Sequence, residues 1–93
     1  MNTYKNLETV LNIYYGHTEL TNALICELFD VSRSTALRYK NKALELQCER
    51  NHNTMNPNSV NTRDAFDAWG IDINDIERRR KKLLDLKLEN VVI

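Results

Sequence analysis

The side chains best suited to chemistry lie between Ser32 and Ala43, where the chain carries four basic residues and no acidic one. An arginine guanidinium pairs two donors at once with a carboxylate, a phosphate or the edge of a guanine base. Lysine ammonium groups hold phosphate as point charges, and hydroxyl groups donate to phosphate or to a base edge. A helix that starts near Ser32 would add free backbone N–H groups, which favour an anion. A basic face of this kind can hold phosphate groups.

A second concentration of positive charge is the run of five basic residues Arg78, Arg79, Arg80, Lys81 and Lys82. Three interpretations are open for this run: a solvated helix face, a strip that binds phosphate, or a contact with acidic residues of a partner. The chain has 13 basic and 13 acidic residues, so its overall field does not favour nucleic acid. Because charges beyond a Debye length of about 8–10 Å are screened, one basic face of a neutral protein can still bind phosphates.

The sequence offers little material for catalysis or for a metal centre. The two cysteines and two histidines make a nominal zinc set, but no two cysteines lie close together in the sequence. There is no glycine-rich phosphate loop, no nucleophile elbow and no carboxylate pair beside a histidine on one helix face. The nominal metal ligands are Cys26, Cys48, His17 and His52. We expect no enzyme, no metal, no cofactor and no small-molecule substrate.

Length and composition fit one small domain. The 93 residues are 42% hydrophobic and 28% charged, an ordinary balance for a globular chain. A chain of this length buries only about 60–65% of its surface on folding, so we expect a homodimer or higher homo-oligomer to stabilise it. The sequence shows no apolar run long enough to span a bilayer and no signal-peptide pattern, and its cysteines suit reduced thiols. We expect a cytoplasmic protein without membrane contacts.

Glycine and proline are scarce, at two and one, and β-branched alternation is absent, which predicts an all-α fold. The first helix is predicted from Tyr4 to Tyr15, with Thr3 as its cap and a left-handed Gly16 at its end. A second helix is predicted to follow Thr18 as its cap and to continue to about Phe29.

A third helix is predicted from Arg33 to about Cys48, with Ser32 as its N-cap. The turn before it contains Asp30, a residue type that tolerates the left-handed backbone normally supplied there by glycine. Small and apolar residues recur where two helices that cross at a sharp angle would touch. These residues are Ile25, Cys26, Phe29, Val31, Ala36 and Tyr39. The spacing predicts an N-terminal three-helix unit, residues 1–50, that contains a helix-turn-helix.

The second half begins with a predicted linker over residues 51–61, which holds five asparagines and the single proline. Thr62 is the predicted cap of a short helix that Gly70 ends. Asp72 is the predicted cap of a longer amphipathic helix that continues to about Asn90.

Residues 62–93 are expected to serve packing or oligomerisation. Two basic residues, Arg80 and Lys87, interrupt the apolar stripe of the last helix, which favours a loose helical dimer over a regular coiled coil. The residues expected in packing or in an interface are Phe66, Trp69, Ile73, Ile76, Leu83 and Leu84.

The segment from Cys26 to Tyr39 resembles the helix-turn-helix of the homeodomain-like superfamily, which occurs in resolvases, transposases and many bacterial repressors. The resemblance extends over residues 22–41 and does not cover the second half of the chain. It implies a recognition helix that lies in the major groove of double-stranded DNA with its first turns on the bases. The residues implied to read bases are Arg33, Ser34, Leu37 and Arg38, and those implied to hold phosphate are Ser32, Thr35, Lys40 and Lys42.

These features predict sequence-specific binding of double-stranded DNA by a small bacterial, phage or mobile-element protein, acting as a transcriptional regulator or a recombination accessory factor. One alternative is the DNA-recognition subunit of a phage packaging machine, similar to a small terminase, which a ring-sized assembly would favour over a dimer. Another is a protein-interaction adaptor with no DNA role, which failure to bind any duplex at low salt would favour.

Overall fold

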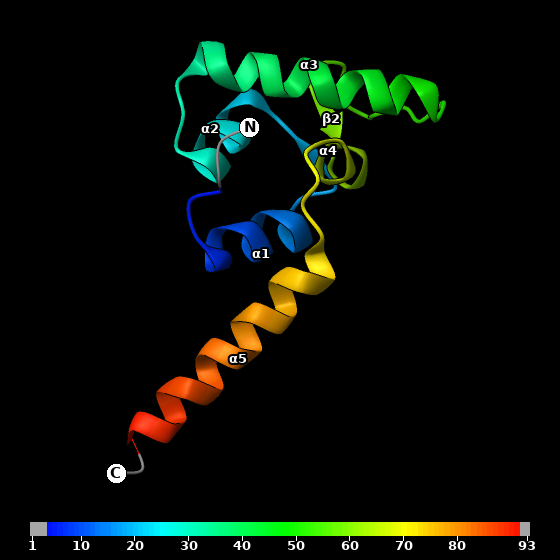
Figure 1. Cartoon of the computed structure of the whole chain (residues 1–93). Coiled ribbons are helices and arrows are strands. Elements are labelled where there is room, and N and C mark those ends of the chain that lie inside the picture. Colours follow the sequence, from blue (N-terminus) through cyan, green and yellow to red (C-terminus); the bar gives the residue numbers. More distant parts are fainter. Residues whose placement is uncertain (1–3, 92–93) are drawn as a thin grey trace.

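The computed structural model describes residues 4–91, and it describes the side chains of residues 4–87. The predicted all-α fold is confirmed, because the chain is mostly helical and its β1 and β2 strands are only two residues long (Figure 1). The elements, in chain order, are α1 (Leu7–Gly16), β1 (Glu19–Leu20), α2 (Asn22–Phe29), α3 (Arg33–Glu49), β2 (Val60–Asn61), α4 (Thr62–Ala68) and α5 (Ile73–Val91).

Helix α1 begins three residues later than the sequence predicts. Its N-cap is Asn6, whose side-chain oxygen accepts the Thr9 backbone N–H at 2.8 Å. The predicted start at Tyr4 is therefore wrong, and Thr3, the predicted cap, lies outside the described residues. The predicted left-handed Gly16 is also wrong, since Gly16 is the last helical residue and the extended residue after it caps the helix.

Helix α2 also starts later, at Asn22, because the residues before it pair with a distant strand. Thr21 is the N-cap in place of the predicted Thr18. Strand β1 pairs with β2 in antiparallel register, and its Leu20 lies opposite Val60 with both side chains fully buried. The segment after Thr18 is extended because burying this apolar pair outweighs the local preference for a helix.

The turn between α2 and α3 has the predicted conformation. Asp30 adopts the left-handed backbone, with φ 54° and ψ 55°. Ser32 caps α3, and its hydroxyl accepts the Thr35 N–H at 3.4 Å. The Val31 N–H donates to the Cys26 carbonyl at 3.2 Å, which closes the end of α2.

Residues 51–61, the predicted linker, return the chain to the body of the molecule. Ser59 and Val60 are buried, and the Thr62 N–H donates to the Thr18 carbonyl at 3.0 Å. Asn61, and not the predicted Thr62, caps α4, since its side chain accepts the Asp64 N–H at 3.0 Å. The structure therefore connects this asparagine-rich segment to β1 through hydrogen bonds and buried side chains.

An aromatic cluster joins the second half of the chain to α2 and α3. The ring of Phe29 on α2 lies 4.9 Å from that of Tyr39 on α3 and 5.1 Å from that of Trp69, with edge-to-face geometry in both pairs. The Trp69 indole N–H donates to the Tyr39 carbonyl at 2.9 Å. Phe66 packs against Tyr14 of α1 with a centroid separation of 4.9 Å. One core thus includes residues from α1 to α5.

Helix α5 leaves this body on the side away from α3 (Figure 1). Asp72 caps it as predicted, since its carboxylate accepts the Asn74 N–H at 2.9 Å. Its first turns pack on α1 through the buried Ile76, whereas Leu83 and Leu84 further along are each 45% exposed. Among the described residues, no helix is both long and apolar enough to cross a membrane.

Candidate nucleic-acid interface

The candidate interface is the solvent-facing side of α3, and α2 packs against the opposite side. The turn over residues 30–32 joins the two helices, and the inward side chains of Ile25, Phe29 and Ala36 are buried between them. Val31 is half-buried against the same core. Burial of one side of α3 leaves the opposite side of its first turns facing solvent.

All four residues expected to read bases are exposed on this face. At 100° per residue, Ser34 and Leu37 lie near its middle, and Arg33 and Arg38 flank them. Leu37 is 45% exposed, whereas the neighbouring Ala36 is fully buried. Among the described residues, neither Arg33 nor Arg38 has an ion-pair or hydrogen-bond partner. Their donors are therefore available to a ligand.

Sequence reasoning missed Asn41 on the same face. Asn41 follows Leu37 by one helical turn and is exposed, and no described residue hydrogen-bonds to its side-chain amide. An asparagine amide can donate to and accept from adenine in the major groove. Its four-residue step from Leu37 is the signal that could have revealed it.

The hydroxyl groups at the start of α3 form a local network. Ser32 Oγ lies 3.2 Å from Ser34 Oγ and donates to Thr35 Oγ1 at 3.2 Å. These contacts orient the three hydroxyl groups around the N-terminus of α3, where free backbone N–H groups favour an anion. The residues expected to hold phosphate here thus occupy one small region.

The two lysines expected to hold phosphate lie in different surroundings. Lys42 is exposed, whereas Lys40 is only 9% exposed and its ammonium group donates to the Asn58 carbonyl. Lys40 lies at the edge of the buried side of α3, next to Ala36 and Ala43, to which it is related by steps of four and three residues. That spacing is the sequence signal that could have separated Lys40 from Lys42.

The basic run of α5 lies apart from the α3 face. Figure 1 shows α5 directed away from α3, and three of the five cations pair with acids of this chain. Arg79 Nε donates to Asp75 at 2.8 Å, which lowers the pKa of Asp75 and raises that of Arg79. Arg78 lies 3.6 Å from the same carboxylate, and Arg80 donates to Glu8 on α1 at 2.6 Å. The structure does not bring this run together with α3.

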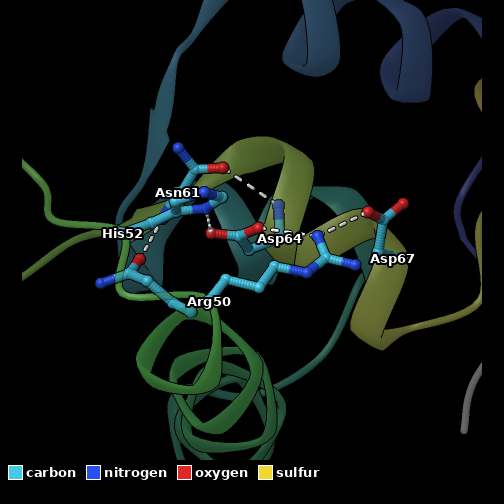
Figure 2. A network of polar contacts seen from close by, with 6 residues as sticks. Arg50, His52, Asn61, Asp64 and Asp67 are labelled. Atoms are coloured by element: carbon cyan, nitrogen blue, oxygen red, sulfur yellow. Dashed lines mark hydrogen bonds and ion pairs between the residues drawn. The ribbon is translucent and has the colours of Figure 1, made fainter.

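A polar network at the opposite end of α3 escaped sequence reasoning (Figure 2). The Asp64 side chain is fully buried, and its two oxygens lie 2.8 Å from Arg50 Nη1 and 2.7 Å from His52 Nδ1. Arg50 Nη1 also lies 2.8 Å from Asp67 Oδ2. Burial raises the pKa of Asp64, but the hydrogen bonds from Arg50 and His52 outweigh it and lower the pKa overall. Asp64 is therefore a charged group with charged and polar partners.

This network fixes the start of α4 against the end of α3. Asn61 caps α4 through the Asp64 N–H, and the Asn61 N–H donates to Gln47 Oε1 on α3 at 2.6 Å. The available sequence signal is an asparagine followed three residues later by an aspartate, since both types favour a helix N-terminus. Its members Arg50 and His52 come from the end of α3 and from the predicted linker, so only the fold brings them to Asp64.

The nominal zinc ligands do not form a cluster. Among the residues whose side chains are described, no group of three or more His, Cys, Asp or Glu is placed to hold a metal ion. Cys26 is a half-buried free thiol, Cys48 is an exposed one, and His52 is engaged with Asp64.

Comparison with known proteins identifies no relative. No protein-family model matches the chain, and no curated protein or solved structure matches it either. The function therefore has to be argued from the residues and their arrangement.

Proposed function

We propose that this chain binds double-stranded DNA in a sequence-specific manner, with α3 in the major groove. One observation carries the proposal: Arg33 and Arg38 are exposed on the first turns of a capped helix, and no residue that the structure describes pairs with them. Two arginines that flank a leucine and a serine match the donor, acceptor and methyl groups that base pairs present in the major groove. Such a protein would act as a transcriptional regulator or a recombination accessory factor of a bacterium, phage or mobile element.

The residues of the face take different parts in this binding. Arg33 and Arg38 pair with the O6 and N7 acceptors of guanine, and each such pair discriminates by about 1–3 kcal/mol. Leu37 contacts a thymine methyl group, and Asn41 extends the same row to an adenine. Ser34 reaches a base edge between the two arginines.

Phosphate contacts set the position of the helix without reading sequence. Ser32, Thr35 and the N-terminus of α3 hold one phosphate, and Lys42 holds another. Lys40 is not among these phosphate contacts, because its side chain is buried and its ammonium group donates to the Asn58 carbonyl. With few phosphate contacts, the salt dependence of binding is modest for a DNA-binding protein.

Selection of bound sequences from a random duplex library tests the proposal. We expect one motif of a few base pairs, bound more tightly than unrelated DNA of the same length. A double variant, Arg33→Ala with Arg38→Ala, should lose that discrimination while keeping its thermal unfolding midpoint. The matched control is Lys5→Ala with Arg63→Ala, which removes two exposed cations outside α3. A double variant that still prefers the selected motif as strongly as the wild type would exclude α3 as the reading helix.

A second copy of the chain is the partner that we propose for α5. Beyond its contact with α1, this helix exposes Leu83 at 45% and Leu86 at 50%, next to Leu7. In a parallel pair of α5 helices, the basic runs of residues 78–82 would lie side by side and repel each other. An antiparallel pair that crosses near Leu83 places the two runs on opposite sides of the crossing point, which reduces this repulsion. Dimers of helix-turn-helix proteins read two half-sites about 34 Å apart.

The oligomeric state in solution tests this pairing. Light scattering at micromolar concentration should give a dimer for the wild type and a monomer for Leu83→Asp with Leu86→Asp. Leu37→Asp is the matched control, because Leu37 is equally exposed on another helix. A wild type that stays monomeric with and without DNA would remove this role from α5, and a ring-sized mass would favour the packaging alternative.

A further inference from the structure

The loop between α3 and β2 has a tip, residues 53–58, whose backbone is held by side chains from distant parts of the fold. The Glu19 carboxylate accepts the Met55 N–H at 2.5 Å and the Asn56 N–H at 3.1 Å. Within the tip, Asn56 Oδ1 accepts the Asn58 N–H at 2.9 Å, and the Thr54 hydroxyl donates to the Asn56 carbonyl at 2.8 Å. The tip is thus preorganised.

The tip is also attached to the flank of α3. The ammonium group of Lys40, near the middle of α3, donates to the Asn58 carbonyl. The Ser59 N–H donates to the Asn56 carbonyl at 3.1 Å, and Ser59 and Val60 are buried where the loop returns to β2. A charged side chain that is 9% exposed and bonded to a loop carbonyl keeps the tip beside the helix.

Three exposed side chains of this tip have no hydrogen-bond partner in the part of the chain that the structure describes. Met55 is 95% exposed, the highest value among the large hydrophobic residues whose side chains the structure describes. No described residue hydrogen-bonds to the side-chain amides of Asn53 and Asn58. The chain has no acidic residue from position 50 to position 63, and the carboxylate of Glu19 is bonded to the loop backbone.

Proteins that enter the minor groove of DNA use this combination of side chains. Asparagine and glutamine amides bind the acceptors on its floor, and apolar side chains such as methionine and proline insert between base steps. The minor groove is about 6 Å wide, so it admits a narrow tip and excludes a helix. An element attached to the flank of a helix in the major groove reaches the adjacent phosphate ridge and the minor groove beyond it.

We infer that residues 53–58 form a second DNA contact, which enters the minor groove next to the major-groove segment occupied by α3. Met55 contacts the groove as an apolar wedge, and the amides of Asn53 and Asn58 bond to the acceptors of A·T pairs. Guanine places an amino group in the minor groove, so this contact favours A·T pairs in the DNA that flanks the motif read by α3. The inference rests on the proposed function and adds a second element to it.

The test compares flanking base pairs that differ in only one groove. Inosine·cytosine pairs lack the guanine amino group, so they resemble A·T in the minor groove and G·C in the major groove. We expect the wild type to bind duplexes with A·T or I·C flanks about equally, and those with G·C flanks about tenfold more weakly. A triple variant, Asn53→Ala, Met55→Ala and Asn58→Ala, should bind all three duplexes with the weaker affinity.

Two controls separate this inference from the proposed function. Asn12→Ala removes an exposed amide from α1 and should leave the flank preference unchanged. Arg33→Ala with Arg38→Ala should abolish reading of the central motif whether or not the tip binds. If the triple variant behaves as the wild type while the arginine variant fails, the tip does not contact DNA and α3 keeps its role. Equal weakening by I·C and G·C flanks would also overturn the inference, and a wild type without duplex preference would overturn both proposals.

Discussion

The two ends of α3 use arginine in opposite ways. Arg33 and Arg38 near its start are exposed without partners among the described residues, whereas Arg50 just after its end lies 2.8 Å from both Asp64 and Asp67. An arginine that two carboxylates hold in one geometry stabilises the fold and is unavailable to a ligand. The start of α3 therefore suits recognition, and its end suits attachment of α4.

The largest effect is expected at the buried end. Asp64→Ala should lower the free energy of unfolding by about 2 kcal/mol, because a fully buried carboxylate loses its hydrogen bonds with Arg50 and His52. Chemical denaturation measures this change. Asp67→Ala is the control, since its carboxylate is half exposed and the pair should contribute less than about 1 kcal/mol. Equal losses for the two variants would contradict the distinction between the buried and the exposed carboxylate.

The exposed end should show the reverse pattern. Arg38→Ala should weaken binding to the selected motif by about tenfold to a hundredfold, because one bidentate contact with guanine is lost. The free energy of unfolding should stay within about 0.5 kcal/mol of the wild type, since no contact within the protein is removed. Fluorescence anisotropy on the motif and on unrelated DNA measures the first quantity. Loss of stability without loss of discrimination would make Arg38 a structural residue.

Low pH should lower the free energy of unfolding through the buried carboxylate of Asp64 near the end of α3. The folded-state pKa of Asp64 lies below its ordinary value, so the folded state binds the proton more weakly than the unfolded state does. The stabilisation is fully present above the ordinary pKa of about 3.9 and is lost as the pH falls through the folded pKa. Denaturation across this range should show a shallower acid limb for Asp64→Asn than for the wild type. If the acid limbs of Asp64→Asn and the wild type coincide, the network around Asp64 is not the source of the loss of stability in acid.

The smallest effect distinguishes the two lysines of α3. Lys42→Met should reduce the slope of log affinity against log salt by about 0.9, the value for one lost phosphate contact. Lys40→Met should leave that slope unchanged, because its ammonium group is bonded to the Asn58 carbonyl. Both variants keep most of the side-chain length, so packing is nearly conserved. A reduced slope for Lys40→Met alone would reverse the assignment.

Local features of the fold were predictable where the deciding contacts lie within a few residues. The left-handed Asp30, the Ser32 cap and the Asp72 cap each depend on neighbours four or fewer positions away. The starts of α1 and α2 were predicted too early. In α2 the reason is long-range, because Leu20 pairs with Val60 in a strand.

The residues of the candidate site also divide into those whose exposure follows from local sequence and those whose state depends on distant partners. The exposure of Arg33, Leu37 and Arg38 follows from a helical period around Ala36, which the sequence displays. The buried Lys40 depends on Asn58, and the paired Arg50 on Asp64, and both partners are more than ten residues away. Residue type alone does not distinguish these cations from their exposed neighbours.

The sequence by itself determined that the chain is helical, that a turn and a capped helix follow Phe29, and that basic residues face outward at the start of that helix. These features result from backbone preferences, capping and helical period, which act over a few residues. Only the tertiary structure decided which cations are available, where the asparagine-rich loop lies, and that α5 leaves the body. Each of these depends on contacts with segments distant in the chain, where a buried polar group without a partner is costly.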